Sequence, residues 1–291
     1  MQHTSSIILR TLVLGSFLTV LFTSCELFSK TVAPTPTPIK TTILTTPNVL
    51  ENKKPSETEF QFYQLLASNP ENVNFSPLSL KIAFSLVYPG TADSTQKLFE
   101  KIFGFSEANP NPFSKEYELA AKIKDENSSE NQLLIENSVW AKNSKEILPE
   151  FKESLKLQNA EVSKLSLDGM NEWVSDTTAH KITKIVDKLD PKLKLVIINA
   201  IYFKEKWAKP FEAKKTAIEP FQASPNLTQR VNMLHDERHI LYYEDSASKW
   251  IALPYAKSPF VMYFGLPLKR FDLKSVDEKM NSTYVLSLIH I

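Results

Sequence analysis

The sequence has little of several things that common enzyme classes require. Its 291 residues include a single cysteine, Cys25, so an intramolecular disulfide cannot form. Only five glycines are present and none are clustered, which excludes a glycine-rich phosphate-binding loop. Lysine and arginine number 34 against 33 aspartate and glutamate, so no excess of positive charge indicates a nucleic-acid partner. These shortages point away from nucleotide-dependent enzymes and from nucleic-acid binding.

Residues 1–24 are expected to be a signal peptide. Arg10 precedes the apolar segment Leu12 to Phe22, which is too short to cross a bilayer comfortably as a permanent helix. Two small residues then lead to Cys25. This order resembles a bacterial lipobox, in which the cysteine is acylated and becomes the first mature residue, although Phe22 stands where a leucine is usual. The alternative is an ordinary signal peptide followed by an incidental cysteine.

Residues 25–55 are expected to carry the lipid and to form a linker. Between Thr31 and Pro47 the chain consists largely of threonine and proline. Proline fixes φ and removes backbone donors, so the segment predicts an extended, solvated tether. Such a tether fits a protein secreted to the cell envelope or extracellular face and held there by a lipid anchor.

The remaining chain predicts helices first and strands later, which is an α+β pattern. Capping residues and helical spacing predict helices near residues 56–66, 77–87, 91–103, 115–126, 148–157 and 168–177. In the first of these helices, Phe62, Leu65 and Leu66 follow the helical spacing of one face. In the last, Asp168 can serve as the N-cap. Runs of apolar and β-branched residues predict strands near residues 133–141, 196–203, 217–221, 229–233, 239–243, 250–253 and 260–266.

The most informative of these strands is Val196 to Phe203. Its dense β-branched and aromatic residues predict a strand buried on both faces in the middle of a sheet. It contains one amide, Asn199. Burying an amide without partners costs about 1 to 3 kcal/mol, so Asn199 should receive hydrogen bonds from neighbouring elements. An ordinary core strand with one asparagine at its edge is the alternative.

A second informative segment is Asn74 to Leu80. Ser76 can accept hydrogen bonds from the first backbone N–H groups of a helix, and Pro77 at the first helical position loses no useful donor. The following residues to Val87 are apolar nearly all round, so this helix should lie inside the protein. Pro89 and Gly90 end it.

Together these segments resemble the serpin family. The similarity continues, in the family's order and spacing, through Gly90-Thr91, Asn199 to Lys204 with Trp207, Pro210-Phe211, Thr216, Phe221, Val231 to Met233, Trp250 to Tyr255 and Phe260 to Pro267. Two family glycines are replaced, by His180 and Glu205. The resemblance implies a serpin domain over residues 56–285, with N-terminal helices around a central sheet and a second, barrel-like sheet.

The resemblance also implies that this domain is incomplete. Family members continue with further strands, a hinge and a reactive loop, none of which matches this sequence. Residues 286–291 do not resemble the family and are expected to be a non-native tail. The chain is therefore expected to be a fragment of a protein that is monomeric when complete.

In function, the resemblance implies a protease inhibitor rather than an enzyme. Inhibitory serpins trap serine or cysteine proteases when the cleaved reactive loop inserts as a new strand in the central sheet. Ser76, Ser79 and Asn199 match the family's shutter, where the sheet parts, and Trp207 matches the breach, where insertion begins. Plain core packing is the alternative role for all four. No cofactor is expected.

Three other readings stay open. The chain could be a non-inhibitory serpin that acts as a binding or carrier module. His235 and His239, four residues apart, could ligate a metal in an enzyme, but they lie in loop and strand patterns and no third ligand is evident. A glycosaminoglycan patch could form from Lys115, Lys122 and Lys124, but interleaved acidic residues reduce its field, and a solvated helix face is favoured.

Overall fold

The computed structural model describes residues 21–22, 57–68, 72–125 and 131–289. Within this part the chain divides into two compact units. The first runs from Gln61 to Lys206, and the second comprises the chain from Trp207 onward together with β1 (Leu21–Phe22) and Glu57 to Phe60. Cys25 and nearly all of the predicted signal peptide and linker lie outside the described residues. No helix in the described part is long and apolar enough to cross a membrane.

The helices of the first unit begin and end largely where the sequence predicts. They are α1 (Glu57–Ala67), α2 (Pro77–Val87), α3 (Asp93–Phe103), α4 (Ser114–Asp125), α5 (Pro149–Leu157) and α6 (Leu167–Thr177). Ser76 caps α2, because its Oγ accepts a hydrogen bond from the Ser79 N–H at 3.1 Å, and Pro77 is the first helical residue. A 3₁₀ turn, η1 (Tyr88–Gly90), ends α2. Gly104 ends α3 with φ of 70°, a conformation that suits glycine.

Two helix details differ from the sequence prediction. The α6 cap is Ser166, whose Oγ accepts from the Gly169 N–H at 3.1 Å, and not Asp168. In α1 the buried residues are Glu59 and Phe60, whereas Leu65 and Leu66 are exposed. Both Ser166 and Asp168 are residue types that cap helices, and several apolar residues of α1 share the helical spacing. The packing of each segment decides which residue caps the helix or is buried.

Three strands form the sheet of the first unit in the order β3-β2-β4: β2 (Gln132–Ala141), β3 (Ala160–Lys164) and β4 (Leu195–Lys204). β4 runs antiparallel to β2, with Asn199 opposite Asn137. The prediction that β4 lies in the middle of a sheet and is buried on both faces is wrong for the described residues. β4 is an edge strand, and only Ala200 in it is fully buried.

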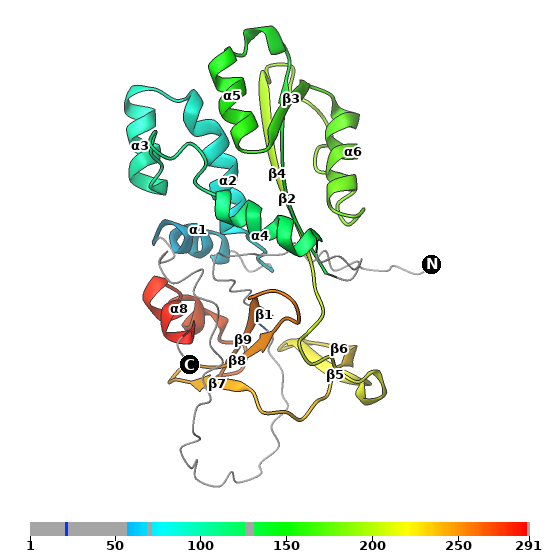
Figure 1. The fold of residues 1–291 in the computed structure, drawn as a ribbon. Coiled ribbons are helices and arrows are strands. Elements are labelled where there is room, and N and C mark those ends of the chain that lie inside the picture. Colours follow the sequence, from blue (N-terminus) through cyan, green and yellow to red (C-terminus); the bar gives the residue numbers. More distant parts are fainter. Residues whose placement is uncertain (1–20, 23–56, 69–71, 126–130, 290–291) are drawn as a thin grey trace. The chain divides into compact units, whose positions relative to one another are not determined.

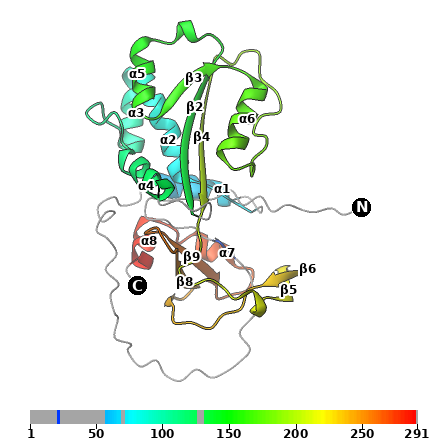
Figure 2. The same ribbon diagram turned by 45° about the vertical axis from the view of Figure 1, so that its right-hand side comes forward.

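Helices cover both faces of this sheet. On one face, Leu86 of α2 and Leu155 of α5 pack against Val139 and the side chains of Leu195 and Ile197. On the opposite face α6 approaches closely, so that a Cβ on Gly169 would lie 3.1 Å from the Trp140 ring. Both views show α2 and α5 on one side of β2 and β4, and α6 on the other (Figure 1 and Figure 2).

The connection from α6 to β4 contains His180, which the sequence analysis expects to replace a glycine. His180 has φ of 58°, in the left-handed region that favours glycine. Its Nδ1 lies 2.9 Å from Ser175 Oγ, and its backbone N–H donates to the Ser175 carbonyl oxygen at 2.7 Å. These two contacts with Ser175 hold the turn with a histidine at positive φ.

The second unit contains two small sheets and two short helices: β5 (Ala217–Ser224), β6 (Leu227–Met233), β7 (Leu241–Glu244), β8 (Ser248–Pro254), β9 (Val261–Pro267), α7 (Leu273–Asp277) and α8 (Ser282–Ile289). β5 and β6 form a hairpin. The other sheet has the order β1-β9-β8-β7, where β1 (Leu21–Phe22) pairs parallel with β9. This sheet is open, so the predicted barrel-like second sheet is not supported in the described part of the chain.

The core of the second unit lies between this open sheet and the two helices. Trp250 is 1% exposed and lies over Gly265 of the neighbouring strand, where a Cβ would come within 2.6 Å of the indole ring. Val276, Val285 and Leu288 from α7 and α8 are equally buried. Part of the predicted non-native tail thus lies in α8, and the tail assignment stays a prediction.

Candidate functional site

Asn199 lies between α2 and the sheet of the first unit and contacts both. Its Oδ1 accepts a hydrogen bond from Ser79 Oγ of α2. Its Nδ2 donates to Asn137 Oδ1 at 2.8 Å and to the Glu136 carbonyl oxygen at 3.3 Å. The hydrogen bonds expected for Asn199 are therefore present although the residue is only half-buried, and they link β4 to α2 and to β2.

These contacts continue into a larger polar network. Asn137 Nδ2 donates to Tyr117 Oη of α4 and to the Gln158 carbonyl oxygen, each at 2.8 Å. The Gln158 side chain, 1% exposed, accepts from Ser85 Oγ at 2.6 Å and donates to the Ser85 carbonyl oxygen at 3.1 Å. We call Ser79, Ser85, Tyr117, Asn137, Gln158 and Asn199 the Asn199 cluster. It joins three helical segments to the sheet.

The Asn199 cluster is electrically neutral near neutral pH. Burial raises the pKa of Tyr117 to about 12, against the opposing effect of its hydrogen bond with Asn137. The other side chains of the cluster are amides and hydroxyls, which do not ionise in this range. The cluster therefore fixes α2 to the sheet through neutral hydrogen bonds, each worth about 0.5 to 1.5 kcal/mol net.

The three residues predicted for the shutter belong to the first unit, and Trp207, predicted for the breach, belongs to the second. Ser79 and Asn199 are in direct contact. Ser76 is one step away, because its hydroxyl oxygen caps α2 by accepting from the Ser79 N–H. Trp207 belongs to the second unit and is described separately. Their assignment to shutter and breach stays a prediction.

Sequence reasoning missed most of the Asn199 cluster. Asn137 carries a partial signal that could have found it, because it is an amide in the interior of a strand that is otherwise largely apolar. Gln158 and Tyr117 follow no such pattern: one lies just after α5 and the other within a polar helix. Only the three-dimensional packing brings these two residues to Asn137.

Trp207 lies in an aromatic stack in the second unit. Its ring is parallel to that of Tyr255, with centroids 4.7 Å apart and an interplanar angle of 13°, and the two residues form an isolated β-bridge. The Phe211 ring meets the indole edge-on at 6.5 Å. The Arg238 guanidinium lies 4.5 Å from the centre of the Phe211 ring and pairs with Asp236. These contacts hold the indole in a single orientation.

The alternative metal and polyanion sites gain no support from the structure. Among the described residues, no three histidine, cysteine, aspartate or glutamate side chains are placed to hold a metal ion. His235 Nε2 instead lies 2.9 Å from Glu219 Oε1, and His239 is exposed. Lys115 and Lys122 are exposed on α4 beside acidic residues.

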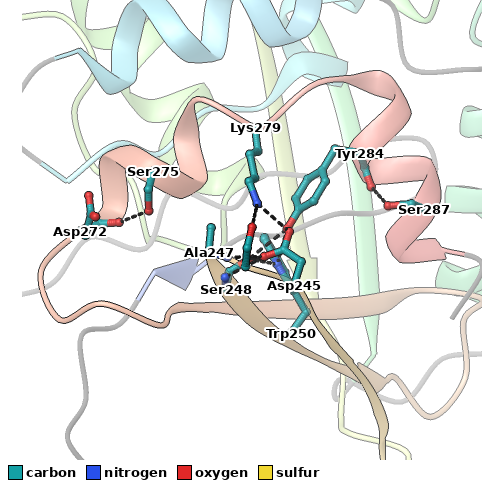
Figure 3. Close-up of polar contacts among 10 residues, drawn as sticks. Asp245, Ala247, Ser248, Trp250, Asp272, Ser275, Lys279, Tyr284 and Ser287 are labelled. Atoms are coloured by element: carbon teal, nitrogen blue, oxygen red, sulfur yellow. Dashed lines mark hydrogen bonds and ion pairs between the residues drawn. The ribbon is translucent and has the colours of Figure 1, made fainter.

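A second polar cluster, missed by the sequence analysis, centres on Asp245 in the second unit (Figure 3). Asp245 Oδ1 accepts from the backbone N–H groups of Ala247 and Ser248, at 2.7 and 2.8 Å. Its Oδ2 accepts from Lys279 Nζ at 3.1 Å and from Tyr284 Oη at 2.9 Å. The carboxylate thereby connects the turn between β7 and β8 to the segment that contains α7 and α8.

The surroundings of Asp245 favour its ionised form. Burial alone would raise the pKa, but the hydrogen bonds from Ala247, Ser248, Lys279 and Tyr284 outweigh burial and lower the pKa of Asp245 to about 2. Burial also raises the pKa of Tyr284 to about 12, so its hydroxyl remains a donor. This cluster is a charged clamp, in contrast to the neutral cluster at Asn199.

Comparison with known proteins gives the family. The family model described as "Serpin (serine protease inhibitor)" matches residues 54–290, which is most of the chain. The chain belongs to the serpin family. Among curated relatives, this serpin is 29% identical over 260 residues to intracellular coagulation inhibitor 2 of Tachypleus tridentatus, covering 82% of this chain and 63% of that protein. It is 30% identical over 258 residues to a leukocyte elastase inhibitor of Xenopus laevis, covering 83% and 68%.

Solved structures show the same fold. Reaction-loop-cleaved lamprey angiotensinogen aligns with a TM-score of 0.70 and 23% identity, covering 80% of this chain and 72% of that one. Thyroxine-binding globulin complexed with thyroxine-fluorescein aligns with a TM-score of 0.67 and 24% identity, covering 80% and 73%.

A serpin-like protein of Thermococcus kodakarensis is 30% identical over 217 residues, with 51% of its length covered. The chain thus spans about half to two thirds of the curated relatives that match it first.

Proposed function

We propose that the protein containing this chain is a serpin-type inhibitor that traps serine or cysteine proteases, and that it is not an enzyme. The observation that carries the proposal is the Asn199 cluster, a set of neutral hydrogen bonds between α2 and the strands β2 and β4. Neutral hydrogen bonds can exchange partners without leaving a buried charge unpaired. This suits a sheet that must part and close around a new strand.

In the proposed mechanism, a target protease cleaves an exposed reactive loop, and the loop inserts beside β4 while the protease is still acyl-linked. β4 is an edge strand in the described part of the chain, which is the position where a strand can be added. Ser79 and Asn199 would hold α2 against the sheet until insertion, and Ser76 would keep the α2 N-terminus in place. Trp207, held by its aromatic stack, would mark the breach, where insertion begins.

The test is covalent complex formation. We expect the protein expressed from its full reading frame to form SDS-resistant complexes with at least one protease from a panel of trypsin-like, chymotrypsin-like, elastase-like and papain-like enzymes. The 291-residue chain, in which no segment resembles a reactive loop, should form none. Complexes would be detected by gel shift and confirmed by mass spectrometry of the linked peptide.

Two outcomes would change the proposal. A complex formed by the 291-residue chain alone would contradict the assignment of the reactive loop to sequence outside it. If the full protein forms no complex with any of the proteases, a non-inhibitory binding or carrier module would be favoured. One protein of the same fold is named a thyroxine-binding globulin.

We also propose that the mature protein is lipid-anchored at the cell envelope through Cys25. The apolar segment Leu12 to Phe22, the small residues before Cys25 and the proline-rich linker support this. Mass spectrometry of the mature N-terminus is expected to show an acylated Cys25. The Cys25→Ser variant should remain unprocessed or be released from the membrane fraction. An unmodified N-terminus at another residue would remove the anchor.

A further inference from the structure

The first unit contains a cavity of about 280 Å³ between η1, the start of α3, the loop after α3 and α5. Its inner wall is formed by the buried residues Ser85, Tyr88 and Phe105, and its rim includes the exposed Glu107 and Asn109. The rings of Tyr88 and Phe105 have centroids 5.6 Å apart. A cavity of this size, with aromatic rings inside and polar groups at the mouth, suits one small organic molecule.

The charge around this cavity has one sign. No lysine or arginine lines it, whereas Glu107 does. Glu107 accepts a hydrogen bond from Gln96 Nε2 at 2.5 Å, and Glu100 accepts one from Tyr88 Oη at 2.9 Å. Burial, together with the hydrogen bond to Glu100, raises the pKa of Tyr88, so its ring is a neutral phenol. The Glu107 carboxylate, together with the electron-rich rings of Tyr88 and Phe105 in the wall, favours a cation.

The inner end of the cavity reaches the Asn199 cluster. Ser85 lines the cavity, and its hydroxyl lies 2.6 Å from Gln158 Oε1. The backbone carbonyl oxygen of Gln158 in turn accepts a hydrogen bond from Asn137 Nδ2. Asn137 Oδ1 accepts one from Asn199 Nδ2. A molecule that fills the cavity therefore contacts Ser85, which is a member of the Asn199 cluster.

We infer that this cavity binds a small organic ammonium compound with a flat apolar ring, and that its occupancy stabilises the Asn199 cluster through Ser85 and Gln158. The ring would lie against Tyr88 and Phe105, and the ammonium group would face Glu107. The binding part stands on the cavity alone. The regulatory part rests on the proposed function, since it concerns the opening of the same sheet.

The test compares three ligands of nearly equal shape by isothermal titration calorimetry on the purified protein. We expect 2-phenylethylamine to bind at least about tenfold more tightly than neutral 2-phenylethanol, and phenylacetate not to bind, because one charge-assisted contact is worth about that factor. Glu107→Gln should weaken amine binding about tenfold. Glu161→Gln removes the same charge from an exposed position on β3 and should leave binding unchanged.

Hydrogen exchange tests the coupling to the Asn199 cluster. We expect the amine to slow exchange in the second half of α2 and at the β2 and β4 residues around Asn137 and Asn199, and Gln158→Met to abolish the slowing in β4 while the amine still binds. Equal affinity for the amine and the acid, no binding of any ligand, or equal losses in Glu107→Gln and Glu161→Gln would overturn the site. Amine binding without a change in β4 would overturn the coupling. Neither readout requires protease inhibition, so these failures are separate from a failure of the proposed function.

Discussion

Replacing Asn199 by leucine is expected to lower the free energy of unfolding by about 1 to 3 kcal/mol. Leucine is similar in size to asparagine, so the loss arises from hydrogen bonding rather than from a cavity. Ser79 Oγ loses its acceptor and Asn137 Oδ1 loses its donor. Both groups lie in part-buried contacts, so the loss of each partner costs part of its desolvation free energy. Urea denaturation of both proteins gives the difference.

The same substitution should promote self-association. A weaker link between α2 and the sheet frees β4 to move, and an apolar edge strand pairs readily with another chain. Size-exclusion chromatography after mild heating should show more oligomer for Asn199→Leu. Asn232→Leu is the matched control, because Asn232 is exposed on β6, and its stability should change by less than about 0.5 kcal/mol. Unchanged stability and unchanged oligomer state in Asn199→Leu would contradict the role of the cluster.

Asp245→Asn is expected to destabilise the protein by about 2 to 4 kcal/mol. The new amide keeps one acceptor oxygen, but its N–H₂ group must face donors in either orientation. In one it faces the backbone N–H groups of Ala247 and Ser248, and in the other it faces Lys279 and Tyr284. It also leaves the Lys279 ammonium without its carboxylate. The turn between β7 and β8 would thereby lose its attachment to α7 and α8. Asp187→Asn is the control and should have little effect, because Asp187 is exposed and forms a surface ion pair with Lys184.

The Asp245 clamp also predicts acid sensitivity. The pKa of Asp245 is about 2 in the folded protein, against an ordinary value of 3.8. Because the folded-state value is the lower one, the stabilisation is present above pH 4 and is lost as the pH falls from about 4 to 2. After allowance for solvent screening, this amounts to about 1 to 2 kcal/mol.

Unfolding curves measured between pH 7 and pH 2 should therefore show a smaller acid-induced loss in Asp245→Asn than in the wild type. Equal losses in the two proteins would mean that the carboxylate is not held by these donors. The neutral Asn199 cluster predicts no such pH dependence. The difference in unfolding free energy between wild type and Asn199→Leu should stay the same over this pH range.

The sequence predicted local features well where one residue type has one physical role. Ser76 and Pro77 define the start of α2, and Gly104 defines the end of α3, because capping depends on immediate neighbours. The environment of Asn199 was also predictable, since a strand amide in an apolar run needs partners. Prediction failed where several residues qualify, as with Asp168 and Ser166.

Features that depend on distant parts of the chain could not be read from the sequence. The apolar content of β4 predicted a central strand, yet strand order is set by the partners that pair with it, and in the described residues only β2 does. Asp245 and Tyr284 show no motif, because their contact depends on how α8 packs against β8. Gln158 is similar: nothing near it in sequence indicates that it meets Ser85.

The β2–β4 pairing has a further consequence for how the chain folds. Every residue pair in this register joins positions that the whole segment from Lys142 to Lys194 separates. Such long-range pairs form slowly, because the entropy cost of closing the intervening loop is paid before the contacts compensate it. During synthesis, β2 emerges before β4 exists, so Asn137 must wait for Asn199. We therefore expect the hydrogen bond between them to form only after β4 has been made, and β2 to be open to pairing with another chain until then.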